Sequence, residues 1–221
     1  MKHWVYILIP VLFFSCKKND NTIIYGYEYF PVDSGHYVVY DVIDILHDDA
    51  VGVHDTTYYQ IKEVIGEEDL DLENETFNKL YRYQRFSDTL AWQLKDVWVV
   101  KKTNTNVEVV EENERIIKMA FSISYDQYWD RNALNNNPAQ QCYYNEIYKP
   151  ATIGAIDYDS TVIVEHQDFS SYIEYDREFE VYARNVGRVQ LVRKHIDIFN
   201  GDTLQVDKGT ELFYTAVDFG G

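Results

Sequence analysis

The chain has 221 residues, of which 46% are hydrophobic and 16% aromatic, and it carries a formal net charge of −17 at pH 7. This apolar content is enough for a sizeable core, which excludes an intrinsically disordered chain. The 37 acidic residues outnumber the 20 basic ones. That excess argues against nucleic acid as a partner and against electrostatic adsorption to anionic lipid, because Lys and Arg recognise both.

Residues 1–15 have the composition of a secretory signal peptide. Lys2 supplies a positive start, and residues 4–14, "WVYILIPVLFF", form an apolar run. The run is too short to span a membrane, which takes about 20 residues of helix. Ser15 is a small residue at the end of the run. The pattern predicts cleavage after Ser15.

The border sequence "LFFSC", which ends at Cys16, resembles the lipobox of bacterial lipoproteins. The resemblance implies that Cys16 carries a thioether-linked diacylglycerol and that its new amine receives a further acyl chain such as palmitate. Two or more acyl chains give a stable membrane anchor, whereas one binds only marginally. Residues 16–24 are then a lipidated tether, and no other cofactor is expected. The competing interpretation is an ordinary cleaved signal with a cysteine by chance.

This lipid anchor places the predicted protein in the cell envelope, on the outer membrane. In some of the resembling bacteria, acidic residues soon after the lipidated cysteine favour export to the surface. Here Lys17 and Lys18 come first, and Asp20 is the only acid nearby. The periplasmic and the surface face therefore both stay open.

Residues 25–221 are predicted to form a single β-rich domain. Residues 36–45, "HYVVYDVIDI", are β-branched and aromatic, as is typical of a strand. Further strands are predicted at residues 56–65, 79–86, 90–103, 107–113, 115–123, 160–168, 177–187, 188–199, 203–206 and 210–219. The Asn200-Gly201 pair is a strong hairpin signal. Strands at intervals of about 10–15 residues predict an all-β fold, an antiparallel meander that forms a barrel, half-barrel or sandwich.

Two acidic stretches contain candidate metal ligands. If "HDDAVGVHD", residues 47–55, lies in a hairpin, His47 and His54 could meet and bind a divalent metal. In residues 67–75, Asp69 and Asp71 alternate as in a calcium loop, but Asn74 replaces the glycine that such a loop requires. Solvated acidic turns are the favoured explanation of both stretches, so no metal is predicted.

Residues from about 124 to 160 show little alternation and are predicted to form one long irregular segment across the sheet. Aromatic rings next to amides and carboxylates can bind sugars or peptides. The candidate ligand-binding residues are therefore Tyr125, Tyr128, Trp129, Asp130 and Asn132. The competing interpretation is that this segment plugs the open end of a half-barrel.

Three stretches have a second resemblance. They are "YFPVDSGHYVVYDV" from Tyr29, "YWDRNALNN" from Tyr128 and "VYARNVGRVQLVRK" from Val181. In this order they resemble uncharacterised β-rich lipoproteins of Bacteroidetes-type bacteria. The resemblance implies a location in the envelope and a β-rich fold, and nothing about activity.

No motif for catalysis is present in the sequence. GxSxG, HExxH, phosphate-loop and CxxC patterns are all missing. Once Cys16 is lipidated, Cys142 has no partner in the chain for a disulfide and is expected to be a small buried side chain. The chain is therefore predicted not to be an enzyme.

The predicted function is a membrane-anchored envelope lipoprotein that binds an apolar ligand or a peptide in a curved β-sheet. One alternative is a structural partner of an outer-membrane or surface assembly, and another is a glycosidase-type hydrolase. A carrier requires a concave apolar cavity of several hundred Å3. A structural partner requires an exposed apolar patch or sheet edge. A hydrolase requires two facing carboxylates, about 5–10 Å apart.

Overall fold

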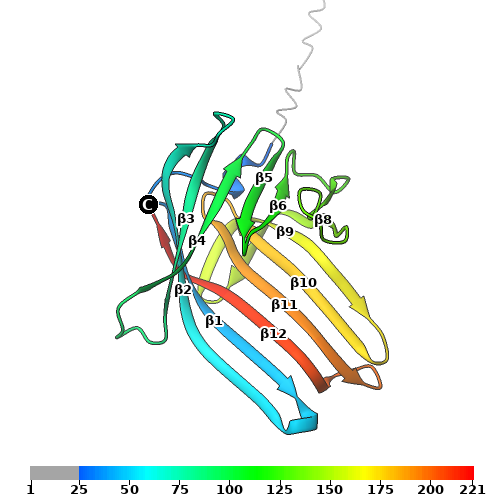
Figure 1. Ribbon diagram of the computed structural model, residues 1–221. Coiled ribbons are helices and arrows are strands. Elements are labelled where there is room, and N and C mark those ends of the chain that lie inside the picture. The colour runs from blue at the N-terminus through cyan, green and yellow to red at the C-terminus, as the bar shows by residue number, and fades with distance from the viewer. Residues whose placement is uncertain (1–24) are drawn as a thin grey trace, which may run out of the picture.

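The computed structural model describes residues 25–221 and consists almost entirely of strands (Figure 1). The predicted signal peptide, Cys16 and the tether of residues 16–24 lie outside the described residues. Two short 3-10 helices, η1 (Tyr27–Tyr29) and η2 (Asp49–Val51), interrupt the strands. The all-β prediction is confirmed. Within the described part of the chain, no helix is long and apolar enough to cross a membrane.

The strands form one antiparallel sheet. They are β1 (Tyr37–Asp48), β2 (Val53–Leu70), β3 (Thr76–Arg85), β4 (Gln93–Lys102), β5 (Asn106–Glu111), β6 (Glu114–Ala120), β7 (Tyr128–Asp130), β8 (Gln141–Ile153), β9 (Ile156–Ser170), β10 (Glu174–Ala183), β11 (Gly187–Phe199) and β12 (Asp202–Gly220). Their order in the sheet is β6-β5-β4-β3-β2-β1-β12-β11-β10-β9-β8-β7. The predicted meander is therefore confirmed, as two runs of neighbouring strands joined where β1 pairs with β12.

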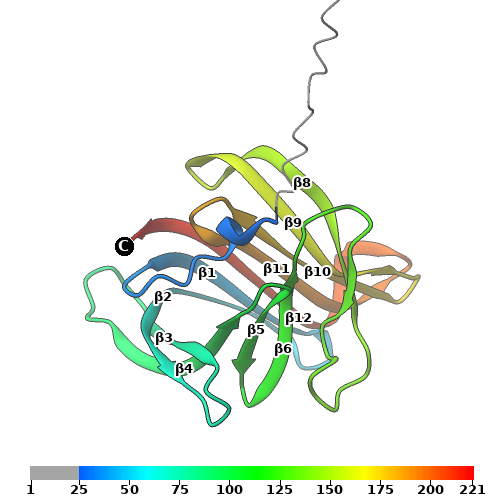
Figure 2. The ribbon, with the colours of Figure 1, turned by 90° about the horizontal axis from the view of Figure 1, so that it is seen from above.

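The sheet curls until its two edge strands, β6 and β7, meet (Figure 2). The amide of Ile117 on β6 donates to the carbonyl of Arg131, at 2.9 Å. In return, Trp129 Nε1 donates to the carbonyl of Ile117, at 3.1 Å. Of the three predicted architectures, the structure is therefore a nearly closed barrel and not a sandwich.

Two turn features of the sequence determine the β11–β12 hairpin. Asn200 and Gly201 have φ angles of 54° and 76°, which a two-residue hairpin turn requires, so the predicted turn is confirmed. Further along β12, Gly209 has a φ of +128°, and a Cβ atom there would lie 2.1 Å from the carbonyl oxygen of His195. Only glycine allows the two strands to approach this closely.

The predicted irregular segment is shorter in the structure. Residues 141–153 form β8 and residues 156–170 form β9, so the irregular backbone here is residues 121–127 and 131–140, with a two-residue turn at 154–155. Along β8 the register against β9 shifts at three places, between Tyr144 and Ala151. Each shift breaks the alternation of buried and exposed residues by which a strand is predicted.

The apolar core lies in two clusters. One contains η1 and the inward residues of β3–β6, β8 and β9, with Tyr29, Val100, Met119 and Val162 fully buried. The other contains residues from β1, β2 and β8–β12, including Val42 and Ile61. Charged side chains from β2, β3, β6, β10 and β11 meet in the barrel interior, and they define the candidate site.

Candidate functional site

A cleft of about 720 Å3 opens into the barrel interior. Three aromatic side chains line it, Tyr59, Trp98 and Tyr214. Its basic lining residues are Arg82, Lys95, Lys118, Arg131, Arg188 and Arg193, and its acidic ones are Glu111, Glu112, Glu114 and Glu178. Basic side chains therefore outnumber acidic ones in the cleft, the reverse of their ratio in the whole chain.

The walls of the cleft are connected by a buried ion-pair cluster, which we call the interior charge network. Glu180 on β10 contacts Lys118 Nζ at 3.3 Å and Arg188 Nη1 at 3.0 Å. Arg188 also reaches Glu63 on β2, at 2.8 Å, and Glu63 contacts Arg82 Nε at 3.1 Å. These residues come from five strands, so the network connects both halves of the sheet.

Arg131 extends the network to the opening of the cleft. Its guanidinium lies 3.0 Å from Glu178 and 3.4 Å from Glu111. Glu178 also contacts Arg193 at 2.8 Å, and Glu111 contacts Lys118 at 2.8 Å. Since Arg131 follows β7, these contacts hold the irregular segment of residues 131–140 against the barrel.

Two glutamates of the network, Glu178 and Glu180, are ionised. Burial by itself raises the pKa of Glu178, but Arg193, His166 and Arg131 outweigh burial and lower it to about 2. For Glu180 burial is opposed mainly by Lys118 and His166, and its pKa is well below the usual range. Both glutamates therefore form charged pairs at neutral pH.

Two residues that line the cleft each have a buried hydrogen-bond donor with no acceptor among the described residues. The donors are Trp98 Nε1 and Arg188 Nε. Trp98 and Arg188 both line the cleft and both line a smaller pocket behind it. Buried donors are nearly always satisfied in folded proteins, by protein groups, ordered water or a ligand. Each of the two donors is therefore a place for ordered water or for an acceptor atom of a ligand.

The smaller pocket is largely apolar, and Phe30, Val38, Leu80 and Val109 contribute to its wall. Its volume of about 60 Å3 is the space of roughly two water molecules. The apolar cavity of several hundred Å3 that an apolar ligand requires is therefore not found here. The large volume lies in the polar cleft, and this favours a polar ligand over the apolar one expected from the sequence.

The five predicted ligand-binding residues are separated in the structure. Tyr125 and Tyr128 are exposed, by 51% and 54%, and Trp129 is buried with its ring 5.1 Å from that of Tyr144. Asn132 lines the cleft.

Asp130 organises the loop after β7 and does not line the cleft. Its Oδ1 accepts hydrogen bonds from the backbone amides of Asn132 and Gln140, both at 2.9 Å. Asp130 and Trp129 therefore help to close the barrel, and Asn132 is the residue of the predicted set best placed to meet a ligand.

The four candidate metal ligands fall in two places. Asp71 accepts the backbone amides of Glu73 and Glu75, at 2.8 and 2.9 Å, and these hydrogen bonds lower its pKa. Asp69 lies 3.6 Å from Lys79. Asp69 and Asp71 therefore belong to a turn at the end of β2, in which the Asp71 side chain accepts hydrogen bonds from backbone amides.

His47 and His54 do lie together, as the predicted hairpin requires, with their Nδ1 atoms 3.1 Å apart. In residues 25–221, no group of three or more His, Cys, Asp or Glu side chains has the arrangement of a metal site.

One cluster with the residue types of a catalytic triad was not predicted from the sequence. Cys142 Sγ lies 3.4 Å from His166 Nδ1, and His166 Nε2 lies 3.2 Å from Glu180. This is the order of nucleophile, base and orienting acid. Burial, however, raises the pKa of the Cys142 thiol to about 12 and lowers that of His166. A buried and protonated thiol is inert, so Cys142 is the packed side chain that was predicted. The three residues are far apart in sequence, and no local motif connects them.

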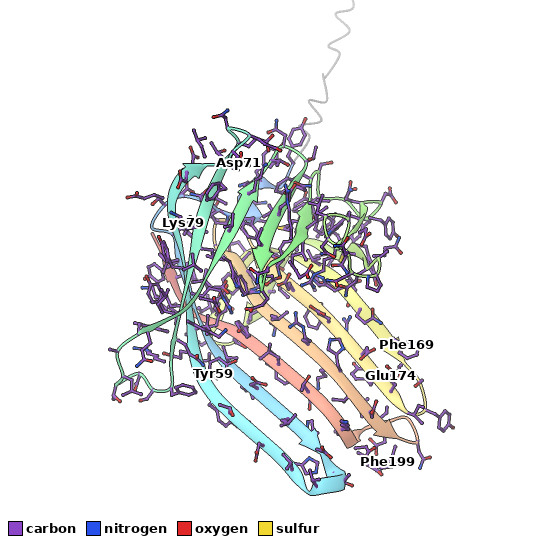
Figure 3. The ribbon with its side chains drawn as sticks, viewed as in Figure 1. Tyr59, Asp71, Lys79, Phe169, Glu174 and Phe199 are labelled. Atoms are coloured by element: carbon purple, nitrogen blue, oxygen red, sulfur yellow. The ribbon has the colours of Figure 1, made fainter. Side chains whose placement is uncertain are left out.

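Three hairpin tips carry exposed apolar side chains. Figure 3 shows Phe169 and Phe199 at two of these tips, at the end of the molecule away from Asp71. The exposed residues at the tips are Leu46, Val51, Phe169, Tyr172, Ile173, Phe199 and Leu204. They supply the exposed apolar surface that the structural-partner alternative requires.

No protein-family model matches the chain, and no curated protein sequence matches it. Among solved structures, the chain is similar to a Bacteroides fragilis NCTC 9343 protein that is described as exported and as having a YmcC-like fold. The two chains are 10% identical, the match covers 87% of this chain and 98% of that one, and the TM-score is 0.48. A likeness at this level assigns neither a family nor a function to this chain.

Proposed function

We propose that the chain is a lipid-anchored protein of the bacterial cell envelope that binds a carboxylate-bearing peptide in the barrel cleft. The protein holds its ligand without transforming it. The observation that carries this proposal is the pair of unpartnered donors, Trp98 Nε1 and Arg188 Nε, on the wall of a cleft enriched in basic residues.

The chemistry of the cleft supports an anionic and extended ligand. Trp98 and Arg188 offer N–H groups to oxygen acceptors, and Arg favours carboxylates over neutral acceptors. At the opening, Asn132, Asn137 and Gln140 offer amides that can pair with a peptide backbone. Leu191 and Leu212 add apolar contact between the charged groups. A cleft of about 720 Å3 is within the usual range of ligand sites, roughly 300–1,000 Å3.

The pKa values of two glutamates in the cleft argue against either of them acting in a glycosidase. Glycoside hydrolysis requires one carboxylic acid that stays protonated near neutral pH. Glu111 and Glu178 line the cleft, and neighbouring cations keep the pKa of each below its usual value against the effect of burial. Neither can serve as the general acid.

The location is supported by the sequence of residues 1–24, which resembles a lipoprotein signal and tether. The test is to replace Cys16 by Ala and to follow radiolabelled fatty acid and membrane fractionation. The proposed anchor predicts loss of both label and membrane association. Label incorporation equal to the wild type would overturn it.

The ligand is tested by calorimetry on the full chain in detergent. The probe is a pool of tetrapeptides rich in Asp and Glu, compared with the matching pool of Asn and Gln peptides. Trp98→Phe removes the indole donor but keeps an aromatic ring, and Trp92→Phe is the matched control because Trp92 does not line the cleft. We expect the acidic pool to bind the wild type and Trp92→Phe, with about tenfold weaker binding to Trp98→Phe. Equal heats from both pools, or equal binding by both variants, would contradict the proposal.

A further inference from the structure

The β1–β2 hairpin holds two histidines in direct contact. His47 and His54 are cross-strand partners in the register of the two strands. Their ring centroids are 5.4 Å apart, with an angle of 62° between the rings, and their Nδ1 atoms face each other at 3.1 Å. This pair is separate from the barrel cleft, because neither residue lines it.

Each imidazole has a carboxylate on its outer nitrogen. His47 Nε2 lies 3.0 Å from Glu211 on β12, and His54 Nε2 lies 3.6 Å from Asp49 in η2. A carboxylate favours the tautomer in which Nε2 carries the hydrogen, which leaves the lone pair on Nδ1. With this tautomer on both rings, two lone pairs face each other at 3.1 Å. A proton or a metal ion between the two nitrogens removes the repulsion between these lone pairs.

The spacing of the two nitrogens fits a transition metal. With metal–nitrogen bonds of about 2.0–2.1 Å, a separation of 3.1 Å gives an angle of roughly 100° at the metal. This angle lies between square-planar and tetrahedral geometry. Imidazole nitrogen is a preferred ligand of Zn2+, Cu2+ and Ni2+, whereas Ca2+ and Mg2+ prefer oxygen.

We propose that His47 and His54 bind one divalent transition-metal ion through their Nδ1 atoms, with Glu211 and Asp49 orienting the two rings. The side chain of His54 is 48% exposed, so water molecules have access to complete the coordination. With two protein ligands, the site binds more weakly than a structural zinc site with four. The competing occupant of the midpoint is a shared proton, which makes a hydrogen bond between the rings.

The experiment uses the full chain in detergent. A chelator first removes bound metal, and the protein is then titrated with Zn2+. Excess Mg2+ is present throughout to occupy sites made of carboxylates alone. Calorimetry should give one ion per chain. His47→Gln and His54→Gln should each weaken binding by about tenfold or more. Glu211→Gln should weaken it by about tenfold, as expected when the partner of a metal-ligating histidine is removed.

His195→Gln is the matched control. His195 is also a strand histidine paired with a carboxylate, Asp176 at 3.0 Å, but it has no second imidazole beside it. Its loss should leave Zn2+ binding unchanged. With Cu2+, electron paramagnetic resonance should show coupling to two nitrogens in the wild type and to one in His54→Gln. Equal Zn2+ binding by the wild type and both histidine variants would overturn the proposal and assign the pair to a shared proton.

Discussion

Arg188 on β11 and Glu63 on β2 form an ion pair of 2.8 Å although they are 125 residues apart in the chain. Two strands, β1 and β12, lie between them in the sheet. Neighbouring strands are about 4.8 Å apart, so a flat sheet would separate these two positions by roughly 14 Å. The contact therefore depends on the curvature of the sheet, which brings both side chains into the barrel interior.

Replacing Glu180 by Gln should strongly destabilise the fold. The side chain is 1% exposed and contacts both Lys118 and Arg188, which would keep buried charges without their partner. Removing one member of a buried ion pair costs about 3–5 kcal/mol. Urea unfolding followed by circular dichroism measures the change. Glu174→Gln, an exposed position on the same strand, is the control and should change stability little. A loss below about 1 kcal/mol for Glu180→Gln would contradict the role given to the network.

Stability should fall in acid. Glu178 has a pKa of about 2 in the fold against 4.5 as its usual value. Its stabilising contribution is therefore complete above about pH 4.5 and is lost as the pH falls towards 2, by an amount on the order of 3 kcal/mol. Burial lowers the pKa of His166 below 6.5 in the fold. Below pH 6.5 the unfolded chain therefore binds a proton at His166 that the folded chain does not, and the loss of stability begins there.

The pH dependence is measured as the free energy of unfolding in urea between pH 7 and pH 3. The Glu178→Gln variant removes one of the titrating groups, so its stability should fall less steeply between pH 5 and pH 3 than that of the wild type. Parallel curves would show that Glu178 does not titrate with a lowered pKa.

Cys142 should not react with a thiol reagent in the folded protein. It is 0% exposed, and burial raises the pKa of its thiol to about 12. Ellman's reagent should therefore detect this thiol only after unfolding in guanidinium chloride. Ser170→Cys places a thiol at an exposed position of β9 and should react at once. Rapid modification that disappears in Cys142→Ser would contradict the assignment of an inert residue.

Replacing Gly209 by Ala should cost more than replacing Gly52 by Ala. Both glycines have a positive φ, but a Cβ atom at Gly209 would meet the His195 carbonyl at 2.1 Å, whereas Gly52 has open space around it. Gly52→Ala should cost about 1–2 kcal/mol from backbone strain alone. Gly209→Ala should add the cost of separating β11 from β12. Equal melting temperatures for the two variants would show that the strands adjust without cost.

The strand content and the meander could be predicted because β-branched and aromatic residues alternate along most of the chain. Asn200-Gly201 predicted its hairpin. His47 and His54 could meet only if residues 47–55 lay in a hairpin, and they do. β8 was missed because three register shifts break its alternation.

The interior site could not be predicted from local patterns. In "REFEVYA", residues 177–183, the sequence places Glu178, Glu180 and Tyr182 on one face. A polar face of an antiparallel strand usually faces solvent. Here it faces the barrel interior, where Lys118 on β6, two arginines of β11 and Arg131 after β7 neutralise it. Partners such as Glu63 and Arg188 are brought together by the pairing of β1 with β12, which no short segment of the sequence indicates.

The most direct test of the proposed function is the indole N–H resonance of Trp98 in a two-dimensional nitrogen–proton spectrum. Trp98 Nε1 has no acceptor among the described residues, whereas Trp129 Nε1 donates to the Ile117 carbonyl. During titration with the acidic tetrapeptide pool, the Trp98 resonance should move to saturation while those of Trp92 and Trp129 stay in place. No movement of the Trp98 resonance, or equal movement with the Asn and Gln pool, would contradict a carboxylate-binding cleft.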